Sequence, residues 1–197
     1  MSDISNGTNF VSQANGAAGH GGAAPDLPRS PGNDMPPGIV DRIRAQAEAL
    51  RNATAFTQAV GVLMRSPHYR DYTIGDLEWL LIPALTNRQY RLAEAKTSEA
   101  DGGRTFPAGI VLWALVSPEV DQRLTEAKDS QPRLDPAEWT SGDIPWLVHA
   151  AGEARFVRPI VKDLMQTIFK DRKVKVLGRD SDDGIKIHVL ELAEGTA

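Results

Sequence analysis

The chain has 197 residues, of which 41% are hydrophobic and 24% are charged, a composition typical of one globular domain. Its net charge of −4 argues against a nucleic-acid-binding protein, because such proteins carry a clustered excess of lysine and arginine. The absence of cysteine excludes disulfides, thiolate nucleophiles and cysteine-based metal sites. There is no signal-peptide pattern and no apolar run near the roughly 20 residues of a membrane helix, so we expect a cytoplasmic protein without a membrane span.

The first 37 residues differ in composition from the rest of the chain. They hold 6 of the 17 glycines and 5 of the 13 prolines, with few bulky apolar side chains. Such a segment buries too little apolar surface to offset the entropy of an ordered chain. We therefore predict a disordered tail over residues 1–37 and one folded domain over residues 38–193. We expect no metal site, because His20 is a lone histidine among glycines.

Helical spacing of apolar residues dominates the first part of the domain. Apolar side chains recur every three or four residues over 39–50 and again over 53–65, which predicts a first helix. This helix ends before Pro67, because proline disfavours the helical conformation in the preceding residue. A second helix begins after Thr73, which suits an N-cap, and ends at Pro83.

Strands and helices alternate in the rest of the domain. Residues 89–95 alternate and predict a strand, and the apolar, branched run over 106–116 predicts a central strand that is buried on both faces. Capping residues, apolar patterns and a turn signal at 182–184 predict the other elements: a helix over 117–128, a polar loop over 129–138, a strand over 145–149, a helix over 153–170, and two strands over 174–177 and 185–190. This order predicts an α/β domain in which helices flank a mixed, mainly antiparallel central sheet.

Histidines are the side chains of most chemical interest, because the sequence contains no Walker loop, nucleophile elbow, dinucleotide fingerprint or zinc-protease motif. His68 follows a Ser-Pro turn between two helices, where turns often expose functional groups. His149 ends an apolar strand, which places it at an edge or mouth of the sheet. Each is either a functional group or an ordinary residue: an exposed turn residue at His68, and a hydrogen-bonded edge residue at His149.

Four blocks of the sequence resemble the RTX-toxin-activating lysine acyltransferases over roughly residues 54–150. They are Ser66-Pro-x-x-Arg70 followed by an aromatic residue, Gln89-Tyr90 after Pro83, the strand from Phe106 to Ala114 with Trp113, and Glu138-Trp-Thr-Ser-Gly-Asp143 followed by Trp146. The resemblance implies a GNAT-like fold and the transfer of a fatty acyl group from acyl carrier protein to a lysine of an RTX-type partner protein. It implies acyl carrier protein as co-substrate and no permanently bound cofactor, and it leaves open a homodimer.

The same resemblance places the catalytic residues where this sequence departs from the family. The catalytic histidine falls at Tyr69, one residue after His68, and the catalytic aspartate falls at His149. We favour a rewired site in which His68 and His149 approach one cleft. One of them takes a proton from the acceptor lysine, since an imidazole has a pKa of about 6.5. Ser66 and backbone N–H groups of residues 66–69 are candidate oxyanion donors, and Tyr69 is a candidate hydroxyl donor to the leaving thiolate.

Two rival functions stay open beside this hypothesis. A protein that kept the fold and lost the chemistry would bind acyl carrier protein or a secreted partner without catalysis. A coenzyme A-dependent acetyltransferase is disfavoured, because the sequence lacks the Gln/Arg-x-x-Gly-x-Gly/Ala loop that holds the pyrophosphate. For the favoured enzyme, the helix over 53–65 and the strand over 106–116 would wall an acyl channel. The acidic carrier protein would dock on a basic surface formed by Arg155, Arg158, Lys170, Arg172 and Lys173.

Overall fold

The computed structural model describes residues 37–127, 133–179 and 185–191. The chain divides into two units, residues 1–40 and 41–197, and the strands that the structure describes lie in the second unit. The predicted tail up to residue 36 and the predicted turn at residues 182–184 lie outside the described residues. None of the described helices is both long enough and apolar enough to cross a membrane.

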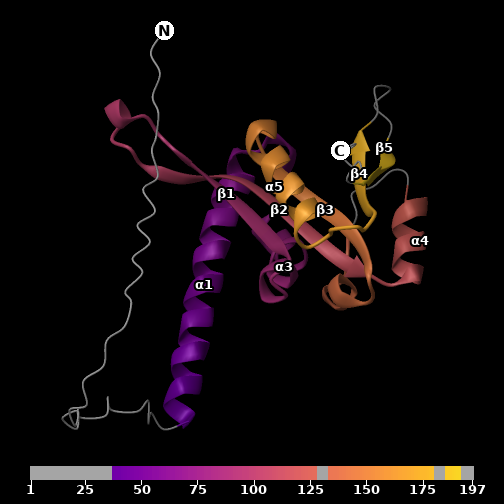
Figure 1. Cartoon of the computed structure of the whole chain (residues 1–197), viewed down its shortest axis with the longest axis horizontal. Coiled ribbons are helices and arrows are strands. Elements are labelled where there is room, and N and C mark those ends of the chain that lie inside the picture. The colour runs from indigo at the N-terminus through magenta and orange to yellow at the C-terminus, as the bar shows by residue number, and fades with distance from the viewer. Residues whose placement is uncertain (1–36, 128–132, 180–184, 192–197) are drawn as a thin grey trace, which may run out of the picture. The chain divides into compact units, whose positions relative to one another are not determined.

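A five-stranded sheet forms the centre of the second unit (Figure 1). Its strands, in spatial order, are β1 (Tyr90–Lys96), β2 (Thr105–Val116), β3 (Ile144–Gly152), β4 (Val174–Arg179) and β5 (Ile185–Leu190). Neighbouring strands pair antiparallel, except β3 and β4, which pair parallel. The predicted mixed, mainly antiparallel sheet is therefore confirmed.

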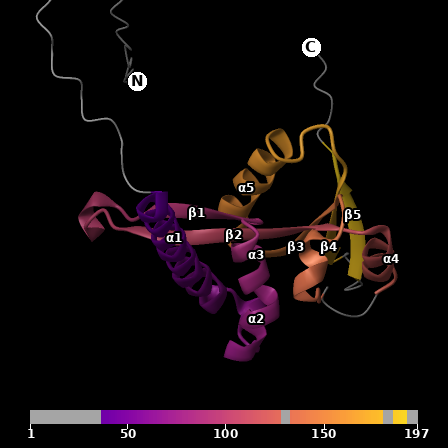
Figure 2. The same ribbon diagram turned by 90° about the horizontal axis from the view of Figure 1, so that it is seen from below.

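Helices pack on both faces of this sheet. They are α1 (Pro37–Arg65), α2 (Leu77–Leu80), α3 (Ile82–Thr86), α4 (Pro118–Glu126) and α5 (Ala154–Gln166). Figure 2 shows α5 on one side of the sheet and α2 and α3 on the other. Each face has its own hydrophobic core, because side chains of α1, α2 and α3 gather in one buried cluster and those of α5 in another.

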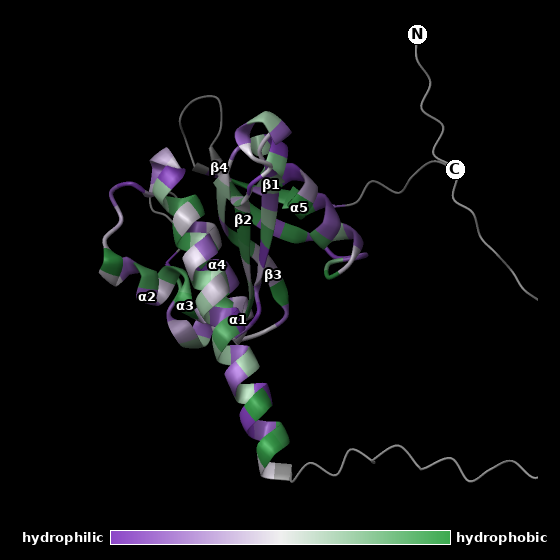
Figure 3. Ribbon diagram, turned by 90° about the vertical axis from the view of Figure 1, so that its left-hand side faces the viewer, coloured by the Kyte–Doolittle hydropathy of each residue, from purple (hydrophilic) through white to green (hydrophobic). Residues whose placement is uncertain are grey.

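The central strand β2 contributes to both cores, as its apolar composition predicts. Its alternate side chains point to opposite faces: Leu112 lies in the core on the α1 side, whereas Trp113 lies in the core on the α5 side. Trp146 of β3 is fully buried in the first of these cores. Figure 3 shows that hydrophobic residues predominate along β2 and β3.

Two predicted segments differ from the structure in the kind of element that they form. The predicted helix after Thr73 is divided into a 3₁₀ turn over Ile74–Asp76 followed by α2 and α3, and Pro83 lies in the first turn of α3 instead of ending a helix. Proline is tolerated there, because the first N–H groups of a helix have no partner within it. The last three residues of the predicted loop over 129–138 belong to a 3₁₀ helix, Pro136–Thr140, which a capping box opens.

The junction between β3 and α5 is the part of the fold that positions the candidate site. Strand β3 runs to Gly152, beyond the predicted strand over 145–149, and α5 follows directly after Glu153 and ends at Gln166, before the predicted end of that helix. Gly152 has a φ of +110°, and a Cβ atom there would lie 2.4 Å from the carbonyl oxygen of Ala108. Only glycine fits this close approach, which holds the junction against β2.

Candidate active site

The turn after α1 carries three of the four predicted site residues. Ser66 has an extended backbone and precedes a 3₁₀ helix, Pro67–Tyr69, in which proline takes the first position. The Ser66 hydroxyl donates to the carbonyl oxygen of Val62 (3.0 Å) and accepts from the N–H of Gly152 (3.1 Å), so it joins α1 to the end of β3. Its single hydrogen is engaged with Val62, so Ser66 would have to break this hydrogen bond to serve as the predicted oxyanion donor.

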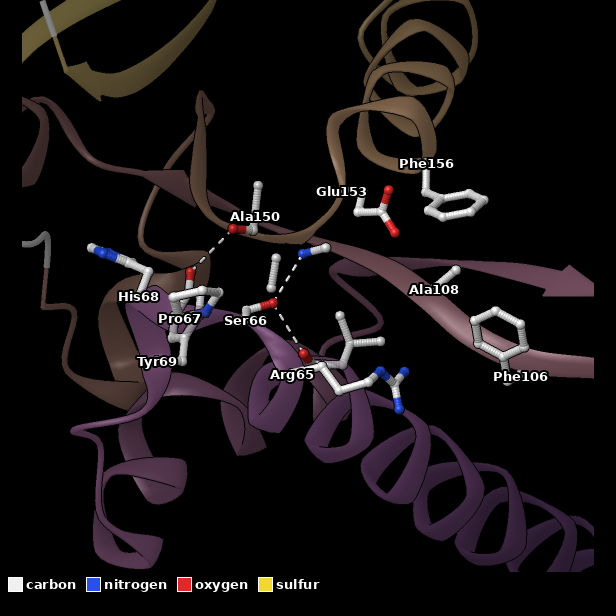
Figure 4. A pocket seen from close by; sticks show the side chains of 13 residues that line it. Arg65, Ser66, Pro67, His68, Tyr69, Phe106, Ala108, Ala150, Glu153 and Phe156 are labelled. Carbon is white, nitrogen blue, oxygen red and sulfur yellow. Dashed lines mark hydrogen bonds between the residues drawn. The ribbon is translucent and has the colours of Figure 1, made fainter.

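A cavity of about 390 Å³ lies between this turn, β2 and the β3–α5 junction (Figure 4). Three of its lining side chains, Arg65, His68 and Glu153, carry ionisable groups. The apolar part of the wall is formed by Val62, Phe106, Ala108, Ala151 and Phe156. The two segments predicted to wall an acyl channel thus contribute their ends nearest the turn, whereas most of their apolar residues fill the two cores.

His68 is exposed and lines the cavity. Its ring meets the ring of Tyr69 edge-on, with the two centroids 5.1 Å apart. In Figure 4, His68 lies on one side of Ser66 and Glu153 on the other. An imidazole in this position can meet a substrate that enters from solvent, which is the first requirement for a general base.

Tyr69 is buried and lines the same cavity. Its hydroxyl oxygen lies 3.4 Å from Nδ1 of His149 and 3.4 Å from the carbonyl oxygen of Ala150, and both distances exceed those of a strong O–H hydrogen bond. Burial, and to a smaller extent the neighbouring Tyr72, raises the pKa of Tyr69 above its usual value. The phenol is therefore protonated at neutral pH, so it can donate a hydrogen bond but cannot act as a base.

His149 faces the turn after α1 because of a β-bulge. The register between β2 and β3 shifts so that His149 pairs with Leu112 while Leu147 pairs with Trp113, and Val148 is the extra residue of β3. Strict alternation would put His149 on the same face as Leu147, in the core on the α5 side. The bulge turns the side chain of His149 to the α1 side of the sheet, the face on which Leu112 lies.

His149 is buried among aromatic rings and does not line the cavity. Its ring centroid lies 6.0 Å from that of Tyr69 and 6.1 Å from that of Trp79, and its Nε2 has no hydrogen-bond partner among the described residues. Burial, and secondly the charge of His68, lowers the pKa of His149 to about 3, which makes it a weak base. Two predictions are corrected: His149 does not end β3, which continues to Gly152, and only His68 of the two histidines faces the cavity.

The sequence matches the model of one protein family, described as the RTX toxin acyltransferase family, over residues 48–192. This range contains all five strands and all four predicted site residues. The chain belongs to the RTX toxin acyltransferase family. A comparison with curated proteins found no match. Membership confirms the resemblance carried by the four sequence blocks and makes the protein an acyltransferase of the class that activates RTX toxins.

In this RTX toxin acyltransferase, the two positions that the resemblance assigns to catalytic residues lie in contact. They are Tyr69 and His149, joined through the phenolic oxygen and Nδ1 at 3.4 Å. By this resemblance, a tyrosine and a histidine stand where a catalytic histidine and aspartate are expected.

Two charged residues of the cavity, Glu153 and Arg65, were not predicted from the sequence. Glu153 is an acidic residue between the glycine that ends β3 and an amphipathic helix. A charged residue at such a strand–helix junction is a sequence signal for a functional group, because loops carry many of them. The guanidinium of Arg65 donates to the carbonyl oxygen of Pro107 and so closes the wall between α1 and β2. No sequence pattern links these two residues, which only the fold brings to one cavity.

Proposed function

We propose that this protein transfers a fatty acyl group from acyl carrier protein to a lysine of an RTX-type partner protein, in the cytoplasm, with His68 as the general base. The observation that carries the proposal is the cavity at the 66–69 turn. It combines an apolar wall suited to an acyl chain, one exposed imidazole and one protonated phenol. Family membership supports the acyl-transfer chemistry, whereas the carrier-protein donor, the lysine acceptor and the role of His68 belong to the proposal.

The reaction needs one base and one hydrogen-bond donor. A lysine ammonium cannot attack a thioester until it loses a proton, and the imidazole of His68 accepts this proton. The amine then attacks the carbonyl carbon, and the C–N bond forms as the C–S bond breaks. Tyr69 donates a hydrogen bond to the sulfur of the leaving thiolate, on which negative charge develops. Of the two protons that the nitrogen loses, one ends on the thiol of the carrier protein and the other reaches solvent through His68.

His68 is assigned as the base because the other two candidates are unsuited to this role. Burial lowers the pKa of His149 to about 3, so this imidazole is too weak a base to take the proton. Burial raises the pKa of Tyr69, so this phenol already holds its proton at neutral pH. His149 acts instead through Tyr69, by accepting a hydrogen bond from the phenol and orienting it. In this proposal His149 is therefore a positioning residue.

The carrier protein docks, in this proposal, on a basic stripe along α5. The stripe consists of Arg158 and Lys162, which lie four positions apart on the exposed face of the helix, whereas Arg155 at the start of the helix pairs with Glu153 at 3.0 Å. The helix begins at the cavity, since Phe156 in its first turn is a lining residue. An acidic protein bound along this stripe would therefore have its acyl group close to the cavity.

Other cations that the sequence suggested for docking are less suited. Arg172 donates to the carbonyl oxygen of Asp143, and Lys173 pairs with Glu191 at 2.7 Å, so both are engaged within the chain. Lys170 is exposed but lies beyond the end of α5. For this reason the stripe on α5 replaces the broader surface predicted from the sequence.

Co-expression tests the proposed function directly. The protein is produced in bacteria with an RTX-type partner protein, and the intact mass of the partner is measured. Wild type should add the mass of a fatty acyl group to the partner, and peptide mapping should place it on lysine, whereas the His68→Ala variant should add little. An unmodified partner in the presence of wild type and a range of acyl carrier protein thioesters would contradict the proposal.

A second candidate function is a binding protein without catalysis. It is favoured by one observation: Tyr69 and His149 replace the expected catalytic residues, and His149 is buried with a low pKa. Such a protein would bind acyl carrier protein or the partner and leave the lysines of the partner unmodified, so the same mass measurement separates the two functions.

A homodimer stays a prediction, which sedimentation of the purified protein would test.

A further inference from the structure

Glu153 is the only carboxylate among the side chains that line the cavity. It occupies the N-cap of α5 with an extended backbone, but its side chain makes no capping hydrogen bond. Figure 4 shows this carboxylate across Ser66 from His68, on the side of Phe156. Because the helix does not use the carboxylate as a cap, its oxygens remain accessible to a ligand in the cavity.

The backbone on either side of Glu153 is held firmly. The N–H of Gly152 donates to the Ser66 hydroxyl at 3.1 Å, and Gly152 pairs with Gly109 of β2. A Cβ atom on Gly109 would lie 3.2 Å from the Cβ of Phe156, so α5 packs closely on this glycine. These two close approaches place the carboxylate at the rim of the cavity.

Arg155 orients the same carboxylate. Its Nε lies 3.0 Å from Oε2 of Glu153 and its Nη2 lies 3.1 Å from Oε1, while its guanidinium carbon lies 4.7 Å from the centre of the Phe156 ring. A carboxylate offers about four lone-pair sites. A guanidinium that binds it from one side therefore leaves sites for a second cation.

We propose that Glu153 binds the ammonium group of the acceptor lysine and so selects positively charged acceptors; this rests on the proposed function. A lysine that enters a partly apolar cavity loses part of its hydration, and a carboxylate at the rim offsets this loss. The ammonium binds first at Glu153. It then gives its proton to His68, on the other side of Ser66, and attacks as the neutral amine.

The first experiment measures binding, so that it does not depend on catalysis. A fluorescent peptide with one central lysine and a matched peptide with norleucine, which has the same length without the charge, are titrated with the full-length protein. Wild type should prefer the lysine peptide about fivefold, the upper range for a partly exposed ion pair, with a smaller ratio at high salt. The Glu153→Gln variant should bind both peptides equally. The matched control is Glu78→Gln, an exposed residue of α2 outside the cavity lining.

The second experiment measures transfer to two nucleophiles. Glu153→Gln should raise KM for the lysine peptide about fivefold with kcat nearly unchanged, and should leave transfer to uncharged hydroxylamine unaffected. Equal preference for the lysine peptide in wild type and Glu153→Gln would overturn the inference. So would an equal loss of kcat with both nucleophiles, which would make Glu153 part of the chemistry. A wild type that binds lysine selectively but never transfers an acyl group would refute the proposed function and leave the lysine subsite standing.

Discussion

The phenolic oxygen of Tyr69 lies 3.4 Å from Nδ1 of His149, although 80 positions separate the two residues. Because the raised pKa keeps the phenol protonated, we assign the hydrogen to oxygen and the acceptor role to Nδ1, which puts the hydrogen of the imidazole on Nε2. The carbonyl oxygen of Ala150 lies at the same distance of 3.4 Å and competes for the phenol hydrogen. Two long hydrogen bonds hold this donor weakly, so it can turn toward a substrate in the cavity.

Replacing His68 should remove most of the activity without unfolding the protein. His68→Ala should lower the rate of acylation about 10²-fold, the usual contribution of a general base. The melting temperature should stay close to that of wild type, because the side chain is exposed. Single-turnover assays and thermal unfolding check both statements. His188→Ala, an exposed histidine of β5, is the matched control, and a wild-type rate in His68→Ala would refute the assignment of the base.

Restoring the residue types that the family resemblance implies should separate a rewired enzyme from an inactive protein. The double variant Tyr69→His/His149→Asp places an imidazole and a carboxylate at positions already in contact. If wild type uses His68, the double variant should remain active when His68→Ala is added, because a second base is present. The test is acylation by the triple variant against the His68→Ala single variant. An equally low rate in both, with both proteins folded, would show that contact alone does not rebuild the site.

The low pKa of His149 should make folding stability depend on pH. Its pKa is about 3 in the folded protein against an ordinary value of 6.5, so the unfolded chain binds more protons between these values. Stability therefore falls as pH drops through this window, and His149 should account for a loss of about 2 kcal/mol between pH 7 and pH 5. Urea unfolding at both pH values should show that His149→Leu loses about 2 kcal/mol less than wild type. Equal losses would mean that His149 is not buried in the neutral form.

Ser66 should prove structural and not catalytic. Ser66→Ala removes the hydrogen bonds to the Val62 carbonyl and from the Gly152 N–H and should lower the free energy of unfolding by about 1–3 kcal/mol. At a temperature where the variant is fully folded, its kcat should fall less than about tenfold, whereas loss of an oxyanion donor costs about 10²–10³-fold. Ser66→Thr, which keeps a hydroxyl, serves as the control. A 10²-fold loss of kcat in folded Ser66→Ala would restore the oxyanion role.

Binding of acyl carrier protein should depend on the basic stripe of α5 and on salt. The double variant Arg158→Glu/Lys162→Glu should weaken binding about tenfold at low salt, and high salt should reduce the difference because exposed charges are screened. Titration by fluorescence anisotropy measures both effects. Arg42→Glu, on the exposed face of α1, changes the net charge at a distant element and should bind like wild type. Tight, salt-independent binding of an acyl-coenzyme A would favour the coenzyme A-dependent alternative.

Much of the fold could be predicted because its signals are local. Helical spacing over 39–65 predicted α1, and the branched apolar run over 106–116 predicted a strand that is buried on both faces. The division of the segment after Thr73 into short helices was missed. There the position of Pro83 admits either the end of one helix or the first turn of the next, and packing decides between them.

The sequence by itself determined the family and most of the elements, and it indicated the 66–69 turn as a candidate site, because alternation, helical spacing and short motifs are properties of neighbouring residues. Only the tertiary structure decided which face of the sheet His149 occupies. The β-bulge that turns it toward Tyr69 exists only in the pairing of β2 with β3, and a shift of one residue moves a side chain to the other face of a sheet. The presence of Glu153 and His68 in the lining of one cavity likewise depends on the close approach of Gly152 to Ala108. Such contacts join distant segments, so no local pattern encodes them.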